Sequence, residues 1–354
     1  MAPILDWETL DWEALGRLRE RFLLGQEKAG TGVYWSSPKD LASYDFTFAR
    51  RIGWKWGAVL AELRRRGWTL PAGPVLDWGC GSGVAGRTVL HFLAPAPPFP
   101  LLLWDHSPLA TAYAAAAARR EFPGLCATAL PDLDATSSQR LGTVVVSHVL
   151  NELDKPGGEA LRRALDKADS ILWVEPGTFT DSRALIAVRE SLREHFDVVA
   201  PCTHAAACGL LRPENARHWC HHFADPPTGL MADSNWVRFA KVSGIDLRSL
   251  PYSYLILERR GLRSPIPGGP SPAWSRVLGR PRVYKGFARL LSCQPEGVEE
   301  LELQKRVDTA LFKTLKNETA GSLWKWTREE ASITAAEPIR VVPRLTSGGR
   351  GRSA

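Results

Sequence analysis

The chain has 354 residues, of which 44% are hydrophobic and 23% are charged, the balance of an ordinary soluble protein. This composition excludes a mostly disordered chain, a collagen-like fibre and a coiled-coil rod. The formal charge of +7 permits an anionic partner, and six cysteines are too few for a small disulfide scaffold. The acidic, amphipathic start is not a secretory signal, and no apolar run is long enough to span a membrane. We therefore expect a cytoplasmic protein without membrane association.

The first 262 residues predict two regions. Residues 1–70 have the pattern of an N-terminal helical region, in which apolar residues recur at helical spacing over 46–66 and Gly67 is placed to end the helix. From residue 71 to 262, short apolar runs alternate with helical segments, which predicts a doubly wound, parallel α/β sheet. The predicted strands cover residues 75–78, 101–105, 143–149, 171–177, 196–201 and 252–260.

The end of the chain has a different texture. Residues 263–275 are rich in proline and glycine and predict a linker. Residues 276–325 predict a basic β extension, in which 284–293 and 298–307 form a β-hairpin. The segment 326–354 is predicted to be a flexible basic tail, because its last residues contain arginines and no acid.

A glycine-rich loop follows the first predicted strand, where the sequence reads PVLDWGCGSG. Glycines let the backbone turn sharply and approach a ligand, and the next predicted strand ends at an acid that is placed to contact ribose hydroxyls. A dinucleotide fingerprint needs Gly or Ala at position 84, where this chain has Val84. The pattern instead resembles motif I of class I S-adenosylmethionine-dependent methyltransferases. The alternative is a tight turn in a Rossmann-like domain without a ligand. The candidate cofactor-binding residues are Asp77, Gly79, Gly81, Gly83 and Asp105.

The segment SHVLNELD, residues 147–154, follows the fourth main strand. Class I methyltransferases often place substrate or cofactor contacts at this point, so His148, Asn151 and Glu152 are pocket candidates. The alternative interpretation is a helix start, with Asn151 as its cap. No residue is identified as a base for methyl transfer, which relies heavily on positioning.

A Cys-rich insertion is predicted over residues 201–235, and its first part holds three of the six cysteines and four of the eight histidines. With one cysteine of the predicted hairpin, the candidate metal ligands are Cys202, Cys208, Cys220 and Cys293. Four thiolates suit an iron–sulfur cluster, and three or four with a histidine suit tetrahedral zinc. Cys80 and Cys126 are expected to be bystanders that behave as small hydrophobic residues.

A family resemblance is carried by VEPGT, VVAPCTH, HWCHHF and YSYLILER, followed by RPRVYKG and LLSCQPEG. These runs resemble the methyltransferase-like small-ribosomal-subunit protein family over about residues 44–316. The resemblance implies a class I methyltransferase fold, a 4Fe–4S cluster on the four candidate cysteines, and association with small-subunit ribosomal RNA. Thr203 and Gly209 stand where the family commonly has prolines. Mitochondrial members act in small-subunit assembly and are suspected of binding the cofactor without catalysis.

The positive charge is concentrated near the carboxyl terminus. Residues 276–316 contain nine Lys or Arg against five Asp or Glu, and residues 339–354 contribute four more arginines. Cations among aromatic residues are typical of phosphate-backbone contact, although a solvated surface is the alternative. The candidate RNA-binding residues are Arg280, Arg282, Lys285 and Arg289.

The sequence thus predicts a class I methyltransferase Rossmann-like sheet with an N-terminal helical region, a Cys-rich insertion and a C-terminal β-hairpin extension. We expect a monomer that binds S-adenosylmethionine and a structural 4Fe–4S cluster and acts on or with the small ribosomal subunit. Methylation of ribosomal RNA is the favoured activity, although turnover and the methylated atom stay open. One alternative is a catalytically inactive assembly factor, and a second is a small-molecule methyltransferase with a zinc-stapled lid.

Overall fold

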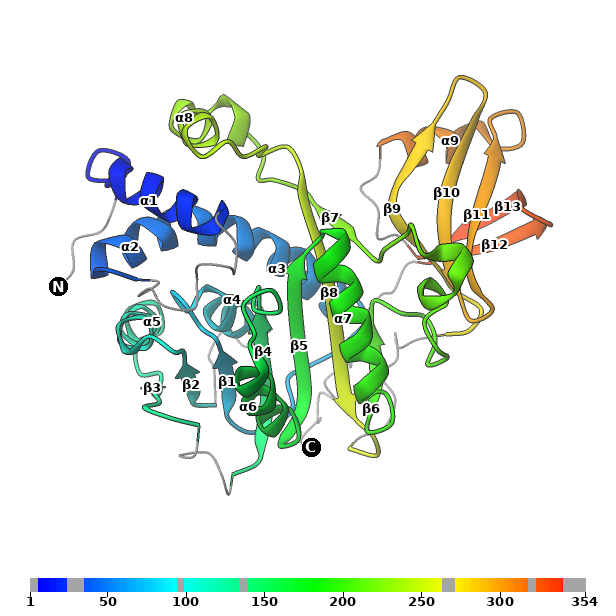
Figure 1. Cartoon of the computed structure of the whole chain (residues 1–354). Coiled ribbons are helices and arrows are strands. Elements are labelled where there is room, and N and C mark those ends of the chain that lie inside the picture. Colours follow the sequence, from blue (N-terminus) through cyan, green and yellow to red (C-terminus); the bar gives the residue numbers. More distant parts are fainter. Residues whose placement is uncertain are drawn as a thin grey trace, which may run out of the picture.

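A computed structural model describes residues 6–23, 35–93, 99–133, 139–262, 271–317 and 323–339. Before the first strand these residues form α1 (Trp12–Leu23), α2 (Pro38–Phe46) and α3 (Phe48–Arg65) (Figure 1). Trp56, Leu60 and Leu63 recur along one face of α3 and are fully buried against the sheet. The helix ends just before Gly67, whose φ of 73° is the left-handed conformation that commonly follows a helix.

The first two helices pack against a helix from much later in the chain. Leu15 of α1 and Leu41 of α2 share a hydrophobic cluster with Trp236 and Phe239 of α8 (Ser234–Ser243). In Figure 1 these three helices lie together beside the same end of the sheet. The N-terminal helices therefore pack against the sheet domain and are not a separate unit.

The central sheet has eight strands in the order β3-β2-β1-β4-β5-β8-β6, with β7 paired to β8. Strands β1 to β5 pair in parallel, whereas β8 is antiparallel to β5, β6 and β7. The strands are β1 (Val75–Trp78), β2 (Leu101–Trp104), β3 (Ala127–Ala129), β4 (Leu141–Ser147), β5 (Ala168–Pro176), β6 (Phe196–Ala200), β7 (His222–Ala224) and β8 (Leu250–Arg259).

Helices cover both faces of this sheet (Figure 1). With α3, one face carries α4 (Val84–Leu93) and α5 (Pro108–Glu121), and the other carries α6 (Lys155–Leu165) and α7 (Phe179–Leu192). A doubly wound sheet whose last long strand inserts antiparallel between β5 and β6 has the strand order of class I methyltransferases. The predicted fold class is confirmed, except that the sheet is not wholly parallel, because hydrophobic patterns do not reveal strand direction.

The C-terminal region is a closed five-stranded barrel, larger than the hairpin expected from the sequence. The expected hairpin is present as β10 and β11, and the barrel closes in the order β10-β11-β13-β12-β9. With a helix between the third and fourth strands, this is the order of the OB fold. Its elements are β9 (Ser275–Val283), β10 (Phe287–Gln294), β11 (Gly297–Gln304), α9 (Thr309–Asn317), β12 (Leu323–Glu329) and β13 (Ser332–Pro338).

The prediction of a flexible tail from residue 326 is therefore wrong up to residue 338. Trp324 and Ile333 are buried in the barrel core, and they hold β12 and β13 in place. The charged residues between these apolar positions conceal the strand pattern in the sequence. The rest of the predicted tail, 340–354, and linker residues 263–270 lie outside the described residues.

The Cys-rich insertion contains the short helices η3 (Gly209–Leu211), η4 (Pro213–Asn215) and η5 (Leu230–Ala232) as well as β7. It packs directly on the turn between β10 and β11. The side-chain amide of Asn215 donates to the carbonyls of Gly209 and Val298, at 3.0 and 3.1 Å. A Cβ at Gly209 would lie only 2.8 Å from the Cα of Gly297, so this contact between backbones requires glycine.

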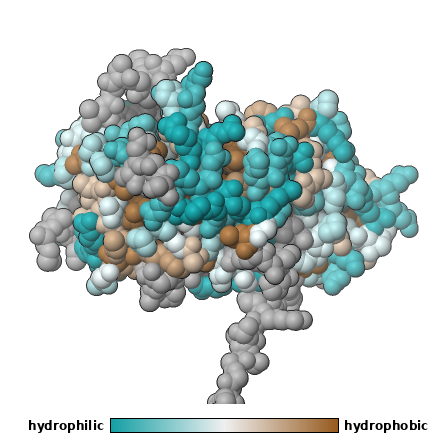
Figure 2. Space-filling view, turned by 90° about the horizontal axis from the view of Figure 1, so that it is seen from below, coloured by the Kyte–Doolittle hydropathy of each residue, from teal (hydrophilic) through white to brown (hydrophobic). Residues whose placement is uncertain are grey.

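In the parts of the chain that the structure describes, no helix combines the length and the apolar character needed to cross a membrane. The face of the molecule seen from below is mainly hydrophilic, with smaller hydrophobic patches (Figure 2). The expected cytoplasmic location stays a prediction.

Candidate functional site

The glycine loop connects the carboxyl end of β1 to the start of α4. Gly79, Gly81 and Gly83 have φ values of 68°, 50° and 79°, a region that side chains enter only at a steric cost. A Cβ at Gly79 would lie 2.8 Å from a methyl carbon of Val149, and one at Gly83 would lie 2.8 Å from the Cβ of Ala114. Backbone conformation and close packing thus both explain glycine at these positions.

Asp77 lies beneath this loop. Its side chain is 1% exposed, and its Oδ2 accepts a hydrogen bond of 2.9 Å from the N–H of Gly86 in α4. Burial raises the pKa of Asp77 to about 7, although the Gly86 N–H and Arg87 act in the opposite direction. In this arrangement Asp77 ties the strand to the helix that follows it. Asp77 thus supports the loop from beneath, and its part in cofactor binding stays a prediction.

Asp105 follows β2 and lies beside the loop. Its Oδ2 accepts from the Gly81 N–H at 2.9 Å, and its Oδ1 accepts from the Ser107 N–H at 2.9 Å. Burial raises the pKa of Asp105, while these two N–H groups favour the charged form. The structure therefore brings the predicted acid and the predicted glycine loop together at the carboxyl edge of the sheet.

Two aromatic residues near this edge were not anticipated from the sequence. A Cβ at Gly81 would meet only Trp35, at 4.0 Å, and the Trp35 ring lies edge-on to Tyr44 with 5.0 Å between centroids. Burial raises the pKa of Tyr44, and the negative charges of Glu152, Asp45 and Asp105 act in the same direction. Aromatic residues such as Trp35 and Tyr44 are equally common in an ordinary core, so nothing in the sequence distinguishes them as residues of a binding site.

His148 lies just beyond β4 in a buried polar group. Its φ is 57°, an uncommon conformation for a residue other than glycine. Its Nε2 lies 3.3 Å from the Lys55 amine and its Nδ1 lies 3.1 Å from the Ser147 hydroxyl. Burial and the neighbouring Arg51 lower the pKa of Lys55 to about 7, and burial and Lys55 hold the pKa of His148 well below its usual value. The other two pocket candidates, Asn151 and Glu152, are exposed in the turn after β4.

Glu175, at the carboxyl end of β5, is the buried acid of this region. Its Oε1 accepts from the N–H groups of Val149 and Leu150 and from the indole of Trp173, at 3.1, 3.3 and 2.6 Å. Burial raises the pKa of Glu175 to about 8, against these hydrogen bonds. Its Oε2 has no hydrogen-bond partner among the described residues. Neither Lys55 nor Glu175 stands out in the sequence, because they lie within a helix and a strand that are otherwise core.

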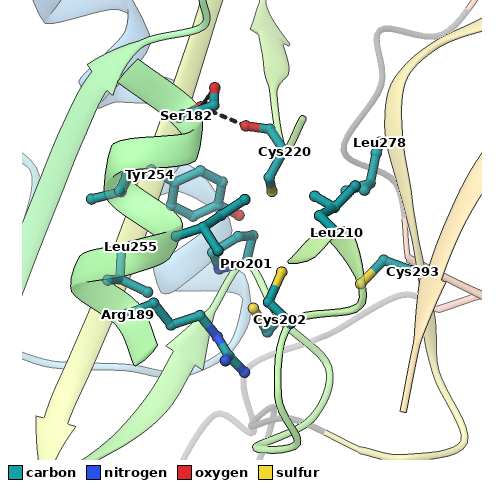
Figure 3. A pocket seen from close by; sticks show the side chains of 14 residues that line it. Ser182, Arg189, Pro201, Cys202, Leu210, Cys220, Tyr254, Leu255, Leu278 and Cys293 are labelled. Atoms are coloured by element: carbon teal, nitrogen blue, oxygen red, sulfur yellow. Dashed lines mark hydrogen bonds between the residues drawn. The ribbon is translucent and has the colours of Figure 1, made fainter. Parts of the chain in front are cut away.

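The four predicted ligand cysteines line one pocket between the sheet domain and the barrel (Figure 3). The space among its lining atoms is about 430 Å³, part of it open to solvent. Figure 3 shows the sulfur atoms of Cys202, Cys220 and Cys293 pointing toward one another from different segments, and Cys208 completes the set. The structure thus brings together thiols from distant parts of the chain, since Cys202 follows β6 and Cys293 lies on β10.

The thiols affect one another electrostatically. Burial and Cys202 raise the pKa of Cys208 to about 11, and burial and the other three thiols raise the pKa of Cys220. The guanidinium of Arg189, which is 3% exposed, faces the pocket from α7. Burial opposes its charge, but Cys202 and Glu190 raise the pKa of Arg189. A buried cation of this kind favours thiolates over thiols.

The donor set can be tested against the metal alternatives. Across the described ranges, no group of three or more His, Cys, Asp or Glu side chains is placed to hold a single metal ion. Tetrahedral zinc uses thiolate sulfurs at about 2.3 Å and imidazole nitrogens at about 2.0–2.1 Å from the metal. Four cysteine sulfurs line the pocket, which is the donor set of an iron–sulfur cluster. The Nε2 atoms of His222 and His204 lie 3.7 and 3.8 Å from the sulfurs of Cys220 and Cys293, so nitrogen donors for zinc are also close by. Cys80 and Cys126 lie outside this pocket.

The basic residues proposed to contact RNA lie on or beside β9 and β10, and all four are exposed: Arg280, Arg282, Lys285 and Arg289. Arg282 of β9 pairs with Glu300 and Arg289 of β10 pairs with Glu302, and both glutamates lie on β11. The charge of this face is thus partly neutralised. The net charge counted from the sequence could not show this, because the pairs depend on strand register.

Residues 114–328, more than half of the 354-residue chain, match a family model described as "Mitochondrial small ribosomal subunit Rsm22". The chain belongs to the Rsm22 family. The matched range of this Rsm22-family chain contains all four pocket cysteines, His148 and most of the barrel, and it begins after the glycine loop and Asp105. A search of curated proteins found no match.

The Rsm22-family chain is also similar to solved methyltransferase structures. One is a putative RNA methyltransferase from Pyrococcus horikoshii, with 13% identity over 58% of this chain and 84% of that one, at a TM-score of 0.36. Another is magnesium protoporphyrin IX methyltransferase from Synechocystis PCC 6803 with bound SAH, with 16% identity over 69% and 94% and a TM-score of 0.36. An O-methyltransferase family protein from Burkholderia thailandensis has 17% identity over 74% and 72% and a TM-score of 0.38. The fold assignment rests on the strand order.

Proposed function

We propose that this Rsm22-family chain binds S-adenosylmethionine at the carboxyl edge of its sheet and acts on or with the small ribosomal subunit. The observation that carries the proposal is the 2.9 Å hydrogen bond from the Gly81 N–H to Asp105, which fixes a carboxylate beside a glycine loop. In open α/β sheets, ligands bind outside the carboxyl ends of the strands. The family description supports the ribosomal partner.

Asp105 keeps acceptor positions beyond its two hydrogen bonds, so it can also accept from ribose hydroxyls. The loop glycines would let the backbone approach the cofactor, while Asp77 holds the loop from beneath. When bound, S-adenosylmethionine supplies an electrophilic methyl group. Calorimetry with S-adenosylmethionine tests the site. We expect Asp105→Ala to weaken binding at least tenfold and Asp197→Ala, on a distant exposed carboxylate, to leave it unchanged. Absence of binding by the intact chain contradicts the proposal.

Ribosomal RNA is the methyl acceptor that we propose, although a non-catalytic assembly factor is the principal alternative. The buried group of Lys55, His148 and Glu175 lies at the ends of β4 and β5, beside the proposed cofactor site. These residues would position an acceptor and exclude water, which is much of what methyl transfer requires. Incubating immature small subunits with methyl-labelled cofactor decides the matter. Cofactor binding without labelled RNA favours the assembly factor.

We further propose that Cys202, Cys208, Cys220 and Cys293 hold a structural 4Fe–4S cluster. The proposal is supported by the convergence of four thiols on one pocket and by the buried guanidinium of Arg189. Four cysteine donors leave no open coordination position for chemistry at the metal. Anaerobic purification followed by iron, sulfide and zinc assays tests this proposal. About four iron and four sulfide per chain are expected, and about one zinc without sulfide overturns it.

The partner and the location follow from the same proposal. Exposed cations on the barrel support contact with ribosomal RNA, and we propose that the protein acts as a monomer. Co-sedimentation with small ribosomal subunits at low salt tests the partner, because contacts to phosphates weaken as salt increases. Failure to co-sediment favours the second alternative, a small-molecule methyltransferase with a zinc-stapled lid. The family description is mitochondrial, so fractionation of cells is needed to place the protein.

A further inference from the structure

Four aromatic rings form a continuous row at the surface between the sheet domain and the barrel, and neither proposed site uses them. The aromatic row consists of Phe179, Trp219, His221 and Phe223. We propose that the aromatic row and the arginines around it bind single-stranded RNA by stacking on its bases. This inference rests on the proposed association with ribosomal RNA. It specifies which surface of the protein contacts the RNA and that the RNA there is single-stranded.

The rings contact one another in sequence. The centroids of Phe179 and Trp219 are 5.8 Å apart at 75°, those of Trp219 and His221 are 4.6 Å apart at 19°, and those of His221 and Phe223 are 5.5 Å apart at 73°. Phe179 is 44% exposed, and the other three side chains are half-buried. Rings held by their neighbours lose little freedom when a base stacks on them, so the row is preorganised for this contact.

Three rings of the aromatic row lie on one face of the segment 219–223, and the opposite face of the same segment lines the cysteine pocket. Side chains alternate along an extended segment, so Trp219, His221 and Phe223 share the face opposite Cys220, which lines the pocket, and His222, which is fully buried. Phe223 also packs against the hydrophobic core of the barrel, and the His221 ring lies against Gly279 of β9. The row is therefore anchored on the barrel at this end, and Phe179 is its most exposed ring.

Guanidinium groups surround the row. Arg280 lies over the ring of Phe223, 3.9 Å from its centroid, and Arg183 lies over the ring of Phe179 at 5.7 Å. Arg217 is exposed beside His218. In the described part of the chain, neither Arg217 nor Arg280 is ion-paired with an acid, unlike the paired Arg282 and Arg289 of the barrel. Alternating rings and unpaired cations are the components of single-strand binding grooves.

The row connects two regions already proposed to meet RNA. At one end, the Trp219 indole donates to the carbonyl of Gly177 at 3.0 Å, just after β5 and two residues from Glu175. At the other end, the N–H of Gly279 in β9 donates to the carbonyl of His221 at 2.9 Å. A Cβ at Gly279 would lie 2.8 Å from the His221 ring, so glycine allows the barrel this close. RNA on the row would thus run from the barrel to the carboxyl edge of the sheet.

The test is fluorescence anisotropy of the full-length protein with a labelled 12-nucleotide oligouridylate and with a 12-base-pair RNA duplex. We expect the single strand to bind and the duplex to bind more weakly, because paired bases are not free to stack. Phe179→Ala should weaken single-strand binding about tenfold with an unchanged salt dependence. Arg280→Ala should weaken it and also reduce the slope of log affinity against log salt by about 0.7. Phe179→Leu, which keeps the apolar bulk, should behave like Phe179→Ala.

Met231→Ala is the matched control, because Met231 is 48% exposed and lies on η5, outside the aromatic row. Thermal unfolding of each variant shows whether the fold is intact. Equal single-strand affinity of Phe179→Ala and Met231→Ala overturns the inference, as does equal binding of duplex and single strand or no binding of the single strand. Cofactor calorimetry and ribosome co-sedimentation on the same preparations report on the proposed function separately. If both succeed while the oligonucleotide fails to bind, only the aromatic row is refuted.

Discussion

Glu62 of α3 and Arg276 of β9 lie 214 positions apart in the sequence and form a buried ion pair, with 3.0 Å between Arg276 Nη1 and Glu62 Oε2. The same carboxylate accepts from Arg66 Nε at 2.9 Å and from the Tyr254 hydroxyl at 2.8 Å. Burial alone raises the pKa of Glu62, but Arg276 and Arg66 outweigh it and hold that pKa far below its usual value. Arg276 Nε also donates to the carbonyl of Pro201 at 3.1 Å. This pair therefore joins the N-terminal helices, the start of the insertion and the barrel.

Glu62→Gln should lower the free energy of unfolding by about 3–5 kcal/mol, because it leaves two buried guanidinium groups without their carboxylate. Urea unfolding followed by circular dichroism measures the change. Glu194→Gln, at an exposed position, should change the stability by less than about 0.5 kcal/mol. A loss of less than 1 kcal/mol in Glu62→Gln would show that the pair contributes no more than a surface salt bridge.

The glycine loop offers a test that separates backbone strain from packing. Gly83 has a φ of 79° and Gly124 has a φ of 89°. A Cβ added at Gly83 would clash with Ala114, whereas a Cβ added at Gly124 would have no atom within 4 Å. Both substitutions by alanine should therefore lose about 1 kcal/mol from backbone strain. Gly83→Ala should lose about 1–3 kcal/mol more and also weaken S-adenosylmethionine binding. Equal losses in the two variants, with unchanged cofactor binding, would contradict a packed loop at this site.

Cys293→Ser tests whether one bound group joins the insertion to the barrel. Cys293 lies on β10, whereas the other pocket cysteines come from the insertion. We expect iron and sulfide content and thermal stability to decrease together, because metal binding contributes folding free energy. Cys126→Ser, at an exposed cysteine outside the pocket, is the matched control and should retain both. Full stability of Cys293→Ser after complete loss of iron would show that the cluster has no structural role.

Much of the fold was predictable from the sequence because its signals are local. The apolar run 75–78 and the glycines after it specify a strand and a turn whatever surrounds them. The four cysteines predicted as ligands line one pocket, because residue type and family motif alone identify them. The antiparallel β8 and the barrel were not predictable, because both depend on which segments pair. The charged residues of β12 alternate with Trp324 and Trp326 and conceal a strand that only barrel closure stabilises.

The same reason explains which site residues were missed. Lys55 and Glu175 lie on elements whose sequences are dominated by core positions, and only tertiary packing brings the Lys55 amine to His148 and buries the Glu175 carboxylate. The predicted pocket residue Asn151 is exposed instead, because the chain turns outward after Val149. Net charge likewise indicated an excess of cations in this region, whereas the register of β10 and β11 places Glu302 opposite Arg289.

Glu175 should make the stability of the protein depend on pH near neutrality. Burial raises its pKa to about 8, whereas an unfolded glutamate has a pKa of about 4.3. Between these values the folded chain binds a proton that the unfolded chain releases. Stability therefore decreases as pH increases through this window, by up to about 1.4 kcal/mol per pH unit. Glu175→Gln keeps an oxygen to accept from Val149 and Trp173 and removes the titration.

Urea unfolding of both proteins at pH 5, 6 and 7 measures this effect. The pKa values of Asp77 and Lys55 are also shifted to about 7, so these groups change charge in the same range. The decisive quantity is therefore the difference in free energy of unfolding between the variant and the parent at each pH. We expect the free energy of unfolding of Glu175→Gln to increase relative to that of the parent as pH increases, since the parent loses stability that the variant retains. Glu159→Gln, at an exposed position on α6, should run parallel to the parent. Parallel curves for Glu175→Gln and the parent would show that Glu175 is ionised in the folded protein, with Lys55 near enough to neutralise it.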